Sequence, residues 1–135
     1  MDEVDEDTVR LAEDTYRMFR DGDLEFFGRL DPEIDWHVTD TFRKGGDLHG
    51  VSEVIDHLEA INEDFEGHPE PEEFIPAGDR VLVLGTWRGR ARQTGVQVEA
   101  RFAHLGRWRD GRLVDFSNYI DSAKVLRALE GPRGT

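Results

Sequence analysis

His104 and Asn118 lie fourteen residues apart in the C-terminal half of the chain, and each interrupts an otherwise apolar row of alternating residues. An imidazole has an ordinary pKa near 6.5, so it can accept or donate a proton near neutral pH. An amide can orient a ligand oxygen or an imidazole, but it cannot abstract a proton. The two residues predict either a polar pair that serves a bound molecule or two buried groups that only satisfy structural partners.

Tyr16 and Asp40 are two further candidates for chemistry. Tyr16 falls on the apolar stripe of an expected helix. Either its hydroxyl donates a hydrogen bond into a cavity, or its ring packs in the core while the hydroxyl contacts water. Asp40 follows an expected strand and could be a base at the rim of a pocket, although most loop aspartates are solvated or form turns. The histidines show no H-E-x-x-H spacing and the chain has no cysteine, so we predict no metal and no cofactor.

Helices precede strands along the chain. Apolar spacing predicts a helix over residues 8–20, a short one after Asp23 and a third after the expected cap Ser52. A strand is expected around residues 34–38, a loop over 39–50 and a Pro-rich turn over 67–73. From residue 74 onward the pattern is β-rich, and a last short helix follows Asp121, which we interpret as its N-cap. This order predicts an α+β fold.

Two turns determine the expected register of the later strands. A two-residue turn at Thr94-Gly95 pairs Gly85 with His104, and a three-residue loop ending at Gly111 pairs Phe102 with Asn118. His104 and Asn118 would then be diagonal neighbours on the concave face, about 7–8 Å apart. Small residues such as Gly85 would leave room for a ligand, as in most small-molecule sites. The expected walls of this pocket are Trp36, Val38, Gly85, Trp87, Phe102, Phe116 and Ile120, and the inward row of the last strand is Val114, Phe116, Asn118 and Ile120.

Several short motifs, in this order and spacing, resemble the SnoaL-like, ketosteroid-isomerase-related branch of the nuclear transport factor 2-like superfamily. They are Asp21-Gly22-Asp23, Trp36, Leu48-His49-Gly50, Thr94-Gly95, His104, Asp110-Gly111 and Asn118-Tyr119-Ile120-Asp121. The resemblance implies a cone-shaped, curved antiparallel sheet with N-terminal helices on its concave face, a deep apolar pocket, and dimers through the outer sheet face.

The resemblance also implies where catalytic groups would stand. In the family's polyketide cyclases a carboxylate base occupies the position of Asn118, with a histidine at the position of His104. Limonene epoxide hydrolases carry an Arg and an Asp where this chain has Gly85 and Trp87. Ketosteroid isomerases place an Asp base nearest Val38 and a tyrosine donor near Tyr16. The chain therefore keeps the histidine and the tyrosine but lacks the carboxylate.

Length and composition restrict the class of protein. The 135 residues suit one domain, which we place at 8–130 between a flexible acidic segment, 1–7, and a tail, 131–135. The net charge of −13 disfavours nucleic acid and anionic membranes as partners, and the scarcity of lysine resembles salt-adapted proteins. The absence of cysteine and of a leader sequence favours a cytoplasmic protein. Two functions remain open: proton-transfer catalysis on a small hydrophobic carbonyl compound, or non-catalytic ligand binding by a dimeric scaffold.

Overall fold

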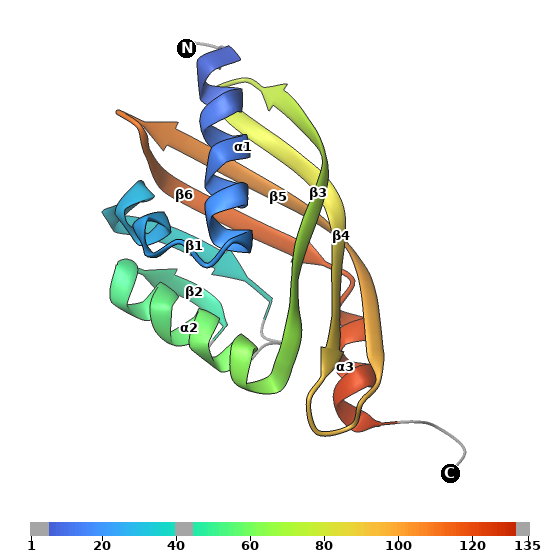
Figure 1. Ribbon diagram of the computed structural model, residues 1–135. Helices are drawn as coiled ribbons and strands as arrows, with labels where there is room; N and C mark the ends of the chain where they lie inside the picture. The colour runs from blue at the N-terminus through green and yellow to red at the C-terminus, as the bar shows by residue number, and fades with distance from the viewer. Residues whose placement is uncertain (1–5, 40–44, 132–135) are drawn as a thin grey trace.

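The chain forms a curved sheet partly wrapped by helices (Figure 1). The structure, a computed structural model, describes residues 6–39 and 45–131. In chain order the elements are α1 (Glu6–Arg20), the 3-10 helix η1 (Leu24–Arg29), β1 (Leu30–Val38), β2 (Gly46–His49), α2 (Val51–Asp64), β3 (Phe65–Ala77), β4 (Arg80–Ala91), β5 (Gln97–Arg109), β6 (Arg112–Ile120) and α3 (Ser122–Glu130).

The sheet has the order β2-β1-β6-β5-β4-β3 and does not close into a barrel. β1 and β6 run parallel, whereas the other neighbouring strands run antiparallel, so the expected all-antiparallel sheet is in fact mixed. Figure 1 shows α1 lying across the sheet, α2 beside β1 and β2, and α3 at the far end of the long strands. The expected α+β architecture with helices over one face of a curved sheet is confirmed.

Two segments expected to be irregular are strands. The predicted Pro-rich turn at 67–73 lies inside β3, which pairs with β4 along almost its whole length. Pro69 and Pro71 are tolerated because β3 is an edge strand, where a missing N–H need not weaken the ladder. The predicted loop 39–50 contains β2, in which His49 pairs with Asp35 of β1.

The expected register of the long strands is wrong by two residues at each hairpin. Residues 92–96 connect β4 and β5 in place of the predicted two-residue turn, so Val83, not Gly85, is opposite His104. Asp110 and Gly111, with φ of 52° and 80°, form a two-residue turn, and the pairing shifts near Val114. As a result His104 lies directly opposite Asn118. A slip of two residues keeps side chains on their expected faces wherever no bulge interrupts the pairing.

The shift near Val114 also changes one inward position, because Leu113 is buried there while Val114 is only half-buried. The helix starts test three predicted caps, Asp23, Asp121 and Ser52. The Asp23 carboxylate accepts a hydrogen bond from the Glu25 backbone N–H at 2.9 Å, as a cap should. Asp121 occupies the N-cap position of α3 without a side-chain capping bond. Ser52 is not a cap, because α2 already begins at Val51 after Gly50, which has a φ of 86°.

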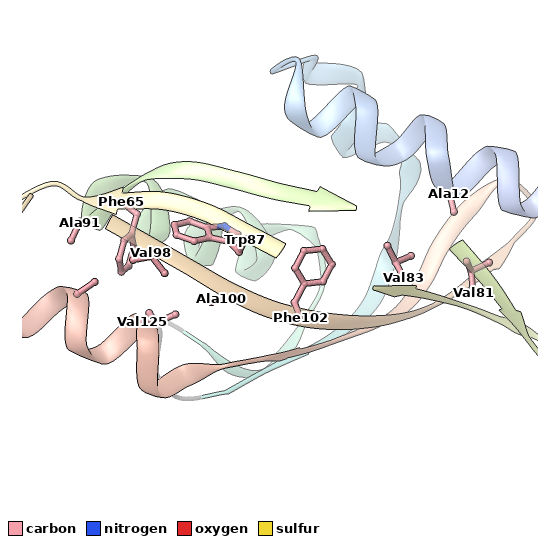
Figure 2. Close-up of a cluster of buried hydrophobic side chains, with 11 residues drawn as sticks. Ala12, Phe65, Val81, Val83, Trp87, Ala91, Val98, Ala100, Phe102 and Val125 are labelled. Carbon is pink, nitrogen blue, oxygen red and sulfur yellow. The ribbon is translucent and has the colours of Figure 1, made fainter. Parts of the chain in front are cut away.

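Two clusters of buried apolar side chains hold the helices against the sheet. In the first, Ala12 of α1 packs toward Val81 and Val83, while Val125 of α3 packs at the opposite end of the strands (Figure 2). The second joins η1 and α2 to β1 and β6. Side chains of both clusters line one cavity between them, and these include Trp87 of the first cluster and Trp36 of the second.

Candidate functional site

A cavity of about 370 Å³ lies between the helices and the concave face of the sheet. Six of the residues singled out in the sequence line it: Tyr16, Trp36, Trp87, His104, Phe116 and Asn118. The described lining also includes aromatic side chains of η1 and histidines of α2 and β3, but no aspartate or glutamate. Asp40, the expected rim carboxylate, lies outside the described residues. The arrangement offers a ligand a largely apolar surface with several polar groups at its wall, among which Arg20 carries a positive charge.

His104 forms the centre of the polar wall, where its Nδ1 and the Tyr16 hydroxyl are 2.5 Å apart. The alternating pattern of β5 buries His104 to 6% exposure, and Phe102 stacks on the imidazole with ring centroids 4.0 Å apart. Burial lowers the pKa of His104 to about 3, an effect that the Asn118 side chain only partly opposes. Burial also raises the pKa of Tyr16 well above its ordinary value. Both groups are therefore neutral at pH 7.

Asn118 faces His104 across the β5–β6 pair. Although its side chain favours the protonated imidazole, the buried Oδ1 makes no hydrogen bond of standard geometry with any described residue. Leaving a buried acceptor unpaired costs roughly 1–3 kcal/mol. This cost is borne within the protein, because the Oδ1 atom has almost no surface open to solvent or to the cavity.

Among families of known proteins, the SnoaL-like domain family matches residues 12–116, most of the chain. This chain belongs to the SnoaL-like family. Among curated proteins, none matches it.

Several solved structures share the fold of this SnoaL-like chain. An NTF2-like protein of unknown function from Burkholderia pseudomallei K96243 is 31% identical with a TM-score of 0.81, over 89% of this chain and 95% of that one. An NTF2-like protein from Burkholderia thailandensis E264 is 24% identical with a TM-score of 0.82, over 90% and 95%. TerC, co-crystallised with polyporic acid, is 24% identical with a TM-score of 0.81, over 91% and 98%.

Four expected wall residues of the SnoaL-like chain are not among those that line the cavity: Val38, Gly85, Phe102 and Ile120. Gly85 illustrates why. A Cβ atom at this position would come within 2.3 Å of the Glu70 carbonyl oxygen and 2.7 Å of the Phe102 ring. The small residue therefore accommodates β3 and Phe102, and Phe102 in turn supports the imidazole of His104. The space at Gly85 is filled by the protein itself.

Two tryptophans carry further unpaired groups. Trp36 of β1 and Trp108 of β5 both line the cavity, and the indole Nε1 of each is buried without a partner among the described residues. The ring of Trp108 lies over Gly106, where a Cβ atom would come within 2.7 Å of it. Trp108 lies four residues after His104 on β5, so both side chains stand on the same face of the sheet, and both line the cavity.

His57 is one of the site residues that the sequence pattern missed. It lies on α2, is 1% exposed and lines the cavity. The predicted apolar stripe was Val54, Ile55, Leu58, Ile61 and Phe65. The buried residues of this helix are instead Val54, His57 and Ala60. Spacing of three residues from Val54 was the available signal, and a polar residue on the stripe concealed it.

The exposed histidines of the SnoaL-like chain make carboxylate pairs on β1 and β2. His49 contacts Asp35 at 2.9 Å and Glu33 at 2.8 Å, and these hydrogen bonds raise its pKa. Within residues 6–39 and 45–131, no group of His, Asp or Glu side chains is arranged to hold a metal ion. None of the helices in the same part of the chain is long and apolar enough to cross a membrane.

Proposed function

We propose that the protein binds a small, uncharged, hydrophobic molecule carrying a carbonyl group, and that the Tyr16–His104 pair serves isomerase- or cyclase-type proton transfer on it. The observation that carries the proposal is the neutral, hydrogen-bonded pair in the wall of a largely apolar cavity. A volume near 370 Å³ lies within the range of small-molecule pockets. The net charge of −13 makes an anionic ligand less favourable.

The chemistry depends on which ring nitrogen of His104 carries the proton. If Nδ1–H donates to the Tyr16 oxygen, Nε2 is unprotonated and can accept a proton from the carbon next to a carbonyl group. A pKa of about 3 makes the imidazole a weak base while the cavity is empty. The enolate formed beside it would stabilise the imidazolium, because opposite charges attract strongly where water is excluded. If the Tyr16 hydroxyl instead donates to Nδ1, His104 becomes a hydrogen-bond donor through Nε2.

A second candidate function is non-catalytic binding of the same class of molecule. Two observations favour it. Asn118 stands where the resemblance implies a carboxylate base, and the described cavity lining contains no carboxylate. A buried imidazole with a pKa of about 3 is suited to hydrogen bonding without proton transfer.

A direct experiment separates the two functions. All three tryptophans of the chain line the cavity, so quenching of intrinsic fluorescence should report occupancy by aryl ketones. Exchange of the ketone α-protons with deuterated solvent, followed by NMR, then reports proton transfer. His104→Gln and Tyr16→Phe should abolish exchange, whereas the exposed His37→Gln and Tyr119→Phe should not. Quenching without exchange would favour the binding function, and no quenching by any compound would refute both.

We also propose that the outer sheet face forms a homodimer, as the resemblance implies. This face carries ion pairs between strands, including Arg88 with Glu70 at 2.6 Å and with Glu99 at 2.7 Å. Exposed pairs of this kind contribute little stability within one chain, so they are available to a partner surface. Analytical ultracentrifugation at low and high salt tests the proposal, since a dimer joined by such charges should weaken as salt increases.

A further inference from the structure

We propose that Arg20 is a specificity-determining residue at the opening of the cavity, where its guanidinium group donates hydrogen bonds to an uncharged acceptor oxygen on the outer end of the ligand. This inference rests on the function proposed above and narrows its ligand class. The molecule would be a ketone whose apolar frame carries a second acceptor, such as another carbonyl group, on the side away from His104.

The opening of the cavity is marked by the lining residues that are exposed to solvent. Among the described lining residues these are Arg20, Asn62 and Gly67. They come from the end of α1, the last turn of α2 and the start of β3. The other described lining residues are buried or half-buried. A ligand whose carbonyl group reaches the buried His104 therefore extends outward toward these three residues.

Arg20 lies one turn after Tyr16 on the same face of α1, where residues four apart have Cβ atoms about 5–6 Å from each other. Burial decreases along the part of α1 that lines the cavity. Thr15 is 3% exposed, Tyr16 and Phe19 are half-buried, and the Arg20 side chain is 57% exposed. A benzene ring that places one substituent at the Tyr16–His104 pair can thus present a substituent on its opposite side to Arg20.

The polar groups at the opening differ in how they are already engaged. Asn62 accepts hydrogen bonds from Arg92 through its backbone oxygen at 2.7 Å and its Oδ1 at 3.4 Å, and Gly67 has no side chain. The Arg20 Nε–H donates to the Asp21 carboxylate at 3.3 Å, while neither Nη atom makes a hydrogen bond with a described residue. Because a guanidinium group carries five N–H donors, Arg20 retains donors for a ligand.

The charges around the opening favour an uncharged acceptor over an anion. Among the described lining residues only Arg20 carries a permanent charge, and the neighbouring Asp21 carboxylate offsets it. The net charge of −13 adds a long-range repulsion of anions. A neutral carbonyl oxygen avoids both effects and still accepts hydrogen bonds from the Nη atoms, whereas an alkyl group cannot accept them.

Two probes of matched shape test the role of Arg20. 1,4-Diacetylbenzene and 4-isopropylacetophenone share one acetyl group and differ in the second substituent, which carries a carbonyl oxygen only in the first compound. Because the isopropyl group is also more hydrophobic, the readout is the ratio of the two affinities, measured by NMR titration of each variant. We expect Arg20→Met, which keeps a long unbranched side chain without donors, to lower the preference for the diacetyl compound roughly 3-fold to 10-fold, the effect typical of one hydrogen bond.

Arg17→Met is the matched control. Arg17 lies on the same helix, its side chain is 59% exposed, and it pairs with Asp14 at 2.7 Å without lining the cavity. The affinity ratio should therefore be unchanged in this variant. A third probe, 4-acetylbenzoate, is anionic at neutral pH and should bind the unmodified protein no more tightly than 1,4-diacetylbenzene.

The outcomes distinguish this inference from the proposed function. An unchanged affinity ratio in the folded Arg20→Met variant would refute the role of Arg20 and leave the carbonyl site at His104 intact. An equal loss of preference in Arg17→Met would trace the effect to the overall charge of α1 and would also refute it. Tighter binding of 4-acetylbenzoate would overturn the claim that the acceptor is uncharged. Failure of both neutral probes to bind would overturn the inference together with the ligand class from which it starts.

Discussion

Lowering the pH should destabilise this protein through His104 in particular. The pKa of this imidazole is about 3 in the folded chain, against an ordinary value near 6.5 when the chain unfolds. Between these values the unfolded chain binds a proton that the folded chain does not. The stability contributed by the neutral ring is therefore complete above pH 6.5 and falls as the pH drops toward 3.

The expected loss is about 1.4 kcal/mol per pH unit below 6.5. It reaches about 3 kcal/mol at pH 4.5 and about 5 kcal/mol at pH 3, because the pKa differs by about 3.5 between the two states. A typical domain has only about 5–15 kcal/mol of net stability. One buried imidazole could thus account for a large part of the acid sensitivity of this chain.

Urea unfolding of the unmodified protein and of His104→Gln, measured in steps from pH 8 to pH 4.5, isolates this contribution. Carboxylates such as Glu66 and Glu72, whose pKa values are lowered by arginine or hydroxyl partners, titrate in both proteins and cancel in the difference. The variant lacks a titrating ring, so its free energy of unfolding should fall less steeply below pH 6.5. Parallel curves over this range would show that His104 gains its proton as readily in the folded state, and the assignment of a neutral Tyr16–His104 pair would be refuted.

Three further results are expected. Tyr16→Phe leaves the buried His104 Nδ1 without its partner and should lower the free energy of unfolding by about 1–3 kcal/mol. The control Tyr119→Phe changes an exposed residue and should alter that free energy by less than about 0.5 kcal/mol. Equal effects of the two substitutions would contradict the role of the hydrogen bond. Gly85→Ala forces a methyl group against backbone atoms and should lower the free energy of unfolding in urea by about 1–3 kcal/mol. Gly28 has open space around it, so the control Gly28→Ala should lower it little. An unchanged stability of Gly85→Ala would mean that β3 does not pack against β4 as described. Raising KCl from 0.1 to 1 M shortens the screening length from about 10 to about 3 Å. Because the chain has a net charge of −13, this weaker repulsion should raise its melting temperature. An unchanged melting temperature would argue against the salt-adapted interpretation.

Local patterns predicted the side-chain faces correctly in strands where the apolar alternation recurs over many residues. Alternation along β4 and β5 assigned Val83, Trp87, Phe102 and His104 to the inner face, and all four are buried. The same patterns failed where a residue type has two uses. Proline marks turns in most contexts, but Pro69 belongs to an edge strand, and whether a strand is at an edge is a property of the whole sheet.

The sequence by itself determined which face each strand residue occupies, because side chains alternate with a period of two and a slip of two residues leaves that assignment unchanged. It could not determine the register, since the length of the loop over 92–96 and the shift near Val114 depend on how neighbouring strands pair. Only the tertiary structure decided that His104 faces Asn118 directly and meets Tyr16 from α1. It likewise decided that Phe102 fills the space at Gly85, while His57 and Trp108 reach the cavity. A cavity is the space left after helices and sheet have packed, so its walls depend on distances between elements that no local pattern contains.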